Sequence, residues 1–202
     1  MLSVTSEMHA LAATMAEPTP EVDEDSLARR FAAGDAGAFD AVVAMHRARV
    51  TRLAYRLLGW RDDVEDVVQE VFLSVFNQLG RFKGESKLGT WLTVITINKC
   101  RTHRRRWFVR WRAMRRRREG TRPGEAPPAD EGARRDETSA QVRLAVQKLR
   151  PRDREVIVLH YLEQHELGEM ARLLGVSQNA VEVRLHRARK RLKVLMMDVD
   201  DE

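Results

Sequence analysis

The sequence predicts an all-α protein of two small helical domains joined by a flexible linker, the C-terminal domain containing a helix-turn-helix. Apolar residues recur at a helical spacing of three to four almost throughout the chain. A segment rich in proline, glycine and charged residues interrupts this periodicity. Near the C-terminus, a glycine separates two helical patterns. The 202 residues have room for two such domains.

These patterns divide the chain into five parts. The predicted parts are an acidic, disordered extension (1–25), a first helical domain (26–106), a basic and then Pro/Gly-rich linker (107–138), a second helical domain (139–197) and an acidic tail (198–202). The Pro/Gly-rich stretch cannot bury enough apolar surface to offset the entropy lost on ordering, so we expect it to be flexible.

The first domain begins with three predicted helices. Ser26 is expected to cap a short helix that ends at Gly34, and Asp35 to cap a long helix that ends at Gly59. Over residues 64–76, valine and phenylalanine recur at i, i+3, i+4 and i+7, which predicts a third helix with one buried face.

A fourth helix is predicted over residues 88–106. Its β-branched middle, Thr93–Ile97, could pass for a strand, but the flanking apolar residues keep helical spacing. Trp91 lies in that apolar stripe, so we expect a core residue rather than a stacking platform. The Arg/Trp run at 107–118 could extend this helix when bound to a partner, follow DNA, line an RNA path or keep the linker soluble, and the sequence leaves these alternatives open.

The second domain ends in the predicted helix-turn-helix. Pro151 fits the first turn of a helix that follows an earlier helix starting near Ser139. Gly175 supplies the tight turn and Ser177 caps the last helix. The polar residues then expected on the exposed face are Gln178, Asn179, Glu182, His186 and Lys193, flanked by Arg184, Arg187 and Lys190 for phosphates. A plain helical hairpin with a solvated basic face is the alternative.

Charge is segregated along the chain, although the net charge is only +6. Residues 1–28 hold six acids and no Lys or Arg, and residues 62–70 hold five acids. Residues 101–118 hold ten arginines and no acid, and residues 184–193 hold six basic residues. Such blocks suit partners of both charge signs, while solvated helix faces would explain any one of them.

The composition excludes several classes of protein. The longest uncharged stretch of the periodic region, Leu88–Asn98, is far shorter than the roughly 20 residues of a membrane span. No basic segment precedes an apolar run, so no secretory signal is expected. The single cysteine, Cys100, excludes an internal disulfide and a Cys-rich zinc site. We therefore expect a cytoplasmic protein without a membrane span.

Two motifs carry a family resemblance. LRPRDREVIVLHYLEQHELGEMARLLGVSQNAVEVRLHRARKRL (149–192) resembles region four of the sigma factors of bacterial RNA polymerase. DDVEDVVQEVFLSVF (62–76) and RFKGESKLGTWLTVITINKCRTHRRR (81–106) resemble sigma region two. Only these two domains are present, which is the layout of the extracytoplasmic-function group. The resemblance implies a factor that binds core polymerase through its clamp helices and flap, directs it to promoters and helps to melt the minus-ten element, and that an anti-sigma factor commonly holds inactive.

The resemblance assigns roles to three sets of residues. The set implied to face the polymerase clamp is Asp62, Asp63, Asp66, Gln69 and Glu70. The set implied to bind the minus-ten element is Asn98, beside a flipped base, with Lys99, Arg101, Thr102, Arg104 and Arg105 along the backbone. The set expected at the minus-thirty-five element is Ser177, Gln178, Asn179, Glu182, Arg184, His186, Arg187 and Lys190. The recognition helix departs from the family pattern at Ala180, Glu182 and Val183.

The main alternative function is a stand-alone helix-turn-helix regulator, which leaves the first domain and its acidic block unexplained. A hydrolase or metal enzyme that uses His160, His165, Glu166 and Glu169 is not expected, because these residues lack metal-ligand spacing and His165/Glu169 is equally a helix pair. We predict no catalytic site, metal or cofactor. The acidic residues 1–25 could mask the basic helices.

Overall fold

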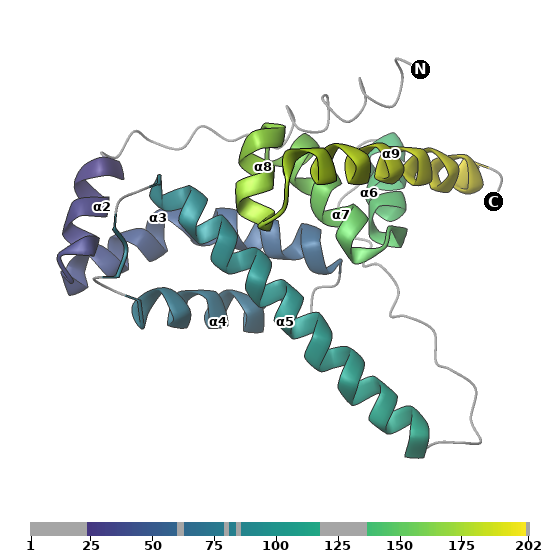
Figure 1. Cartoon of the computed structure of the whole chain (residues 1–202). Coiled ribbons are helices and arrows are strands. Elements are labelled where there is room, and N and C mark those ends of the chain that lie inside the picture. The colour runs from purple at the N-terminus through teal and green to yellow at the C-terminus, as the bar shows by residue number, and fades with distance from the viewer. Residues whose placement is uncertain (1–23, 60–62, 79–80, 84–85, 118–136, 201–202) are drawn as a thin grey trace. The chain divides into compact units, whose positions relative to one another are not determined.

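The computed structural model describes residues 24–59, 63–78, 81–83, 86–117 and 137–200. The helices are α2 (Glu24–Ala32), α3 (Ala36–Leu58), α4 (Val64–Phe76), α5 (Leu88–Arg117), α6 (Glu137–Lys148), α7 (Pro151–Ile157), the π-helix η1 (Val158–Leu162), α8 (Leu167–Leu174) and α9 (Gln178–Asp200) (Figure 1). No strand occurs in these described ranges, so the all-α prediction is confirmed. The helices form two compact units, α2 to α5 and α6 to α9.

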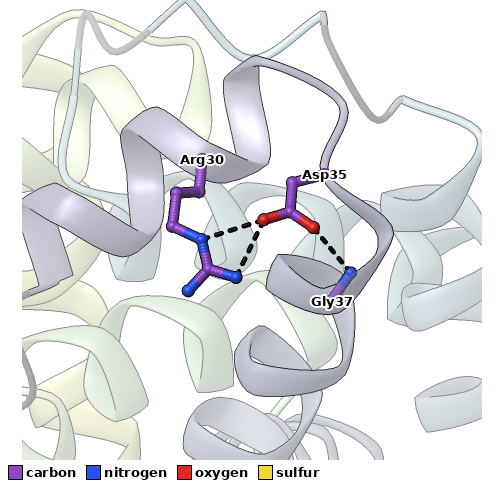
Figure 2. Close-up of polar contacts among 3 residues, drawn as sticks. All are labelled: Arg30, Asp35 and Gly37. Atoms are coloured by element: carbon purple, nitrogen blue, oxygen red, sulfur yellow. Dashed lines mark hydrogen bonds and ion pairs between the residues drawn. The ribbon is translucent and has the colours of Figure 1, made fainter.

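The junction between α2 and α3 is set by local contacts. Asp35 Oδ1 accepts a hydrogen bond from the Gly37 backbone N–H at 2.9 Å, and Oδ2 accepts one from Arg30 Nε at 2.9 Å (Figure 2). The hydrogen bond from Arg30 is the main cause that lowers the pKa of the Asp35 carboxyl. Gly34 and Gly59 adopt left-handed φ angles of 80° and 82°. The predicted cap and both predicted helix ends are therefore confirmed.

The predicted start of the first helix is wrong, because α2 begins at Glu24 and Ser26 lies inside it. Glu24 Oε1 accepts a hydrogen bond from the backbone N–H of Gly89, 65 residues away, at 3.0 Å. The same carboxylate oxygen lies 3.9 Å from Nε2 of His46 on α3. These long-range contacts hold the first turn of α2, and a carboxylate in a first turn is also favoured by the helix dipole.

The core of the first unit follows the predicted apolar stripes. On α4 the buried residues are Val64, Val67, Val68, Val71, Phe72 and Val75. Phe76 was expected in this stripe but is 51% exposed, and its ring meets Phe39 edge-on with centroids 5.2 Å apart. Trp91 packs against Phe31 and Phe82 at 5.9 Å and 5.3 Å between centroids, as expected of a core aromatic residue.

Burial of His46 makes the stability of the first unit depend on pH. Desolvation is the main cause that lowers the pKa of His46 below its ordinary 6.5, with Glu24 acting in the opposite direction. The unfolded chain therefore binds a proton more readily than the folded one, so this part of the stability is present above about pH 6.5 and is lost as the pH falls. We expect a lower urea midpoint at pH 5.5 than at pH 7.5, with a smaller difference in His46→Gln. The exposed His186→Gln is the control, and equal pH dependence in both variants would contradict the assignment.

Helix α5 continues beyond its predicted end at Arg106 and ends at Arg117. The segment up to Arg117 has neither Gly nor Pro after Gly89, and arginine is a good helix former, so nothing local stops the helix. Within the predicted linker, 107–138, residues 107–117 are thus helical, while 118–136 lie outside the described residues. Figure 1 shows the last turns of α5 extending past the end of α4.

In the second unit, a buried arginine of α7 caps the C-terminal end of α6. Pro151 is the first residue of α7, as predicted. The Arg154 side chain is buried and donates to the carbonyl oxygens of Val146 at 3.2 Å and Leu149 at 3.3 Å, and also to that of Gln147. Because the last carbonyls of a helix have no partner within it, Arg154 acts as the C-terminal cap of α6.

Candidate nucleic-acid and protein interfaces

The acidic face of α4 is divided between outward-pointing and internally paired side chains. Asp66 and Gln69 are exposed. Glu70 pairs with Arg106 of α5 at 3.0 Å, and Asp63 Oδ2 lies 3.3 Å from Nε2 of the buried His103. Asp62, the remaining member of the predicted set, lies outside the described residues.

A further acidic residue of α4, Glu65, pairs with Arg47 of α3. Helix α4 is therefore flanked by ion pairs to α3 on one side and to α5 on the other, and Asp66 with Gln69 lies between them. Isolated surface ion pairs contribute little stability, so these pairs show which side of α4 faces each neighbouring helix and do not account for its packing. Among the described residues that were predicted to face the polymerase, Asp66 and Gln69 are the two that are exposed.

The predicted minus-ten residues lie on α5, but not all on one face. Asn98, Arg101, Thr102 and Arg105 share one face at i, i+3, i+4 and i+7. Asn98, Thr102 and Arg105 are exposed there and Arg101 is half-buried. The opposite face carries the buried residues Thr96, Cys100 and His103.

Lys99 and Arg104 were predicted with that set, and the helix places them on its two flanks instead. Both are half-buried. The four-residue face is consequently the part of α5 that a strand of nucleic acid could follow directly. Along the helix it presents the Asn98 amide first, then Arg101, the Thr102 hydroxyl and Arg105.

The helix-turn-helix forms from α8, the turn at Gly175 and α9. Gly175 has a left-handed φ of 67°, and Ser177 Oγ accepts a hydrogen bond from the Ala180 backbone N–H at 3.2 Å. Both sequence assignments are confirmed. The face of α9 that packs on the rest of the unit consists of Val181, Leu185, Ala188 and Leu192.

The predicted recognition residues occupy the other faces of α9. Those exposed to solvent are Ser177, Gln178, Asn179, Glu182, His186, Arg187, Lys190 and Lys193. Arg184 is half-buried, on the flank of the buried stripe. Gln178 Nε2 donates a hydrogen bond to Glu182 Oε1 at 3.3 Å. This contact orients Glu182, which is the carboxylate in the set predicted to bind DNA.

Two basic residues of α9 have structural contacts that the sequence did not indicate. The Arg189 guanidinium lies over the Tyr161 ring, 5.5 Å from its centroid, and Arg191 pairs with Asp153 of α7. Their partners are 28 and 38 residues away in the sequence, so no local pattern identifies them. Of the six basic residues in 184–193, these two pack within the second unit.

The enzyme alternative gains no support from the described residues. Among them, no group of three or more His, Cys, Asp or Glu residues is arranged to hold a metal ion. His165 Nδ1 lies 2.8 Å from Glu169 Oε2, so these two side chains pair with each other. They are not the helix pair that the sequence suggested, because His165 precedes α8, which begins at Leu167. Within the described helices, none is long and apolar enough to cross a membrane.

Comparison with protein families matches both units of the chain. Residues 42–118 match the family described as Sigma-70 region 2, and residues 139–192 match Sigma-70, region 4. The first match includes the whole of α5, to its end at Arg117.

Individual proteins and solved structures are similar along most of the chain. The RNA polymerase sigma factor CnrH of Cupriavidus metallidurans is 34% identical over 194 residues, 91% of this chain and 98% of that protein. The ECF RNA polymerase sigma factor SigM of Mycobacterium tuberculosis is 30% identical over 87% of this chain and 86% of that protein. The structure of CnrH in complex with the cytosolic domain of CnrY matches with a TM-score of 0.61 and 32% identity, covering 88% of this chain and 98% of that one. At 22% identity, the fold also matches RpoE of Bartonella quintana, solved with the anti-sigma factor NepR, with a TM-score of 0.63 over 79% of this chain and 96% of that one.

Proposed function

This chain belongs to the extracytoplasmic-function group of sigma-70 factors of bacterial RNA polymerase, and we propose which of its exposed residues bind core polymerase and which bind each promoter element. As a sigma factor it binds core polymerase, directs it to promoters and is not itself an enzyme. A stand-alone regulator would need only the second unit, whereas the region 2 match covers most of the first.

We propose that Asp66 and Gln69 form the centre of the polymerase-docking surface. The observation that carries this is their exposure between the two ion-paired flanks of α4. Basic groups of the clamp helices would form charge-assisted hydrogen bonds with Asp66. Asp63 and Glu70 then act as positioning residues, because their carboxylates contact His103 and Arg106 of α5.

The α5 face of Asn98, Arg101, Thr102 and Arg105 is proposed to hold the melted minus-ten strand. The Asn98 amide offers both a donor and acceptor to the edge of a flipped base. The arginines follow within one to two helical turns, where the backbone phosphates of the same strand would continue. Lys99 and Arg104 are proposed to contribute long-range charge from the flanks rather than direct contacts.

The exposed face of α9 is proposed to read the minus-thirty-five element in the major groove. Ser177 and the first amides of α9 would face a phosphate, while Asn179 and Glu182 would reach base edges. Glu182 accepts hydrogen bonds only, so it favours the amino group of cytosine. Arg187 and Lys190, both exposed, are the proposed phosphate contacts.

Regulation by an anti-sigma factor is also proposed, because RpoE of Bartonella quintana, a sigma factor of similar fold, was solved in complex with the anti-sigma factor NepR. Since core polymerase and promoter DNA are its partners, we propose that the chain acts in the cytoplasm.

Asn98→Ala tests the role in melting. We expect initial promoter binding to be retained and open-complex formation to fall by about tenfold, since the lost hydrogen bonds are made only to an extruded base. Permanganate reactivity of unpaired thymines measures opening, and a gel shift at low temperature measures binding. Asn77→Ala, an exposed asparagine at the end of α4, is the matched control. Equal loss of binding and opening would rule out the base-pocket role.

A further inference from the structure

The last turns of α5 carry an exposed cluster of aromatic and arginine side chains, which we call the α5 extension (residues 105–114). Phe108 is 50% exposed and Trp107 is 44% exposed. The Trp111 ring is nearly parallel to both, at 14° to Trp107 and 24° to Phe108, with centroids 6.3 Å and 6.0 Å away. The Arg112 guanidinium lies 5.7 Å from the centroid of the Phe108 ring.

This cluster is not part of the core of the first unit. His103 is buried, whereas every described side chain from Arg105 to Met114 is exposed except Trp111, which is half-buried. Large aromatic residues are costly to leave in water, and a monomeric protein rarely gathers several at one place on its surface. The extension therefore has the character of a binding surface.

The sequence spacing joins this surface to the proposed minus-ten face. Asn98, Arg101, Arg105, Phe108 and Arg112 follow one another at steps of three and four residues, which places them along one stripe of α5. At 1.5 Å per residue, Phe108 lies ~15 Å further along the helix than Asn98. A strand held at Asn98 and Arg105 can continue onto Phe108 and Arg112 without leaving the helix.

The charge and the ring chemistry select the class of ligand. Residues 101–118 contain ten arginines and no acid, which favours a polyanion. Exposed rings beside guanidinium groups stack on unpaired bases while the arginines neutralise phosphates. A duplex keeps its bases stacked on each other and would leave these rings unused.

Resting on the function proposed above, we propose that the α5 extension is a second single-stranded DNA site, in which Phe108, backed by Trp111, stacks on an unpaired base and Arg112 binds the adjacent phosphate. This site extends the grip on the melted strand beyond Arg105. It gives a binding role to the Arg/Trp run for which the sequence left several alternatives open.

The test is equilibrium binding of the full-length chain to a labelled 15-nucleotide oligothymidine and to a dA·dT duplex of the same length. Phe108→Ala should weaken single-strand binding by about 5- to 100-fold and leave duplex binding within about twofold. Arg112→Gln should lower the slope of log affinity against log salt by about 0.7 for the single strand. Met114→Ala, at a site 60% exposed on the same extension, is the matched control. Far-UV circular dichroism verifies that the variants keep their helices.

Three results would overturn the proposal. Single-strand affinity of Phe108→Ala equal to that of Met114→Ala removes the stacking role. If Phe108→Ala lost affinity equally for the single strand and for the duplex, the extension would bind duplex phosphates. If its affinity for both DNAs were unchanged while its affinity for core polymerase fell, the extension would bind a protein partner. A transcription assay with the wild-type chain and core polymerase tests the proposed function separately. It measures sigma activity independently of the role of Phe108, so a failure of the second DNA site can be distinguished from a failure of the proposed function.

Discussion

Asp66→Arg is expected to prevent assembly with core RNA polymerase at physiological salt. Asp66 is exposed at the centre of the proposed docking surface, so the variant places a guanidinium against the basic groups of the clamp. Juxtaposed like charges cost several kcal/mol, which corresponds to an affinity lower by more than about 100-fold. Titration of labelled chain with core polymerase, followed by fluorescence anisotropy, measures the effect.

The matched control for this experiment is Asp40→Arg. Asp40 is an exposed carboxylate on α3 in the same unit, and its reversal changes the net charge by the same amount. We expect Asp40→Arg to bind core polymerase within about threefold of wild type, because rim charges mainly affect association rate and salt dependence. If both variants lost affinity equally, net charge and not the α4 surface would be responsible. Normal binding of Asp66→Arg would contradict the proposed interface.

Arg154→Ala is expected to destabilise the second unit by about 2–5 kcal/mol, a large part of the stability of a small domain. The Arg154 side chain is buried and its guanidinium donates to three carbonyl oxygens at the end of α6. Alanine would remove the Arg154 donor from the carbonyls of Gln147 and Leu149, and each carbonyl left unsatisfied costs about 1–3 kcal/mol. The Val146 carbonyl keeps its hydrogen bond from the Leu149 backbone N–H at 3.2 Å. Native-state hydrogen exchange of amides in α6 and α7 follows this unit separately from the first.

The exposed Arg152 provides the control within the same helix. Arg152→Ala removes an arginine from α7 without a buried contact, and we expect a change below about 0.5 kcal/mol. Arg154→Lys should lie between the two, because an ammonium group cannot reproduce the fork of the guanidinium. Protection in Arg154→Ala equal to that in Arg152→Ala would show that the carbonyls find other donors and that the cap is not important for stability.

Features that depend on neighbouring residues could be predicted from the sequence. Asp35, Gly59, Gly175 and Ser177 were identified correctly because a cap or a left-handed turn is satisfied within four residues. The buried face of α4 followed from its helical spacing in the same way. The family motifs are also local, and they were sufficient to indicate both matched regions.

The site residues show where this local information ends. Sequence spacing placed Asp63, Asp66, Gln69 and Glu70 on one helix, but it could not distinguish those that contact α5 from those that face outward. Similarly, Lys99 and Arg104 are near neighbours of Asn98 in sequence and lie on different flanks of α5. The length of α5 was underestimated. The apolar periodicity ends with the last core residue of the helix, whereas the arginine-rich residues that follow still favour a helical backbone.

The sequence by itself determined the helical class, the capped helix ends, the charged blocks and the family. Only the tertiary structure decided that Ser26 lies inside a helix, that Phe76 faces solvent, that α4 is tied to α5 through Asp63 and Glu70, and that Arg154 closes α6. The physical reason is the range of the interactions. Caps and apolar stripes are satisfied within a few residues, whereas the Glu70–Arg106 and Glu24–Gly89 contacts join residues 36 and 65 positions apart, which meet only when the helices pack.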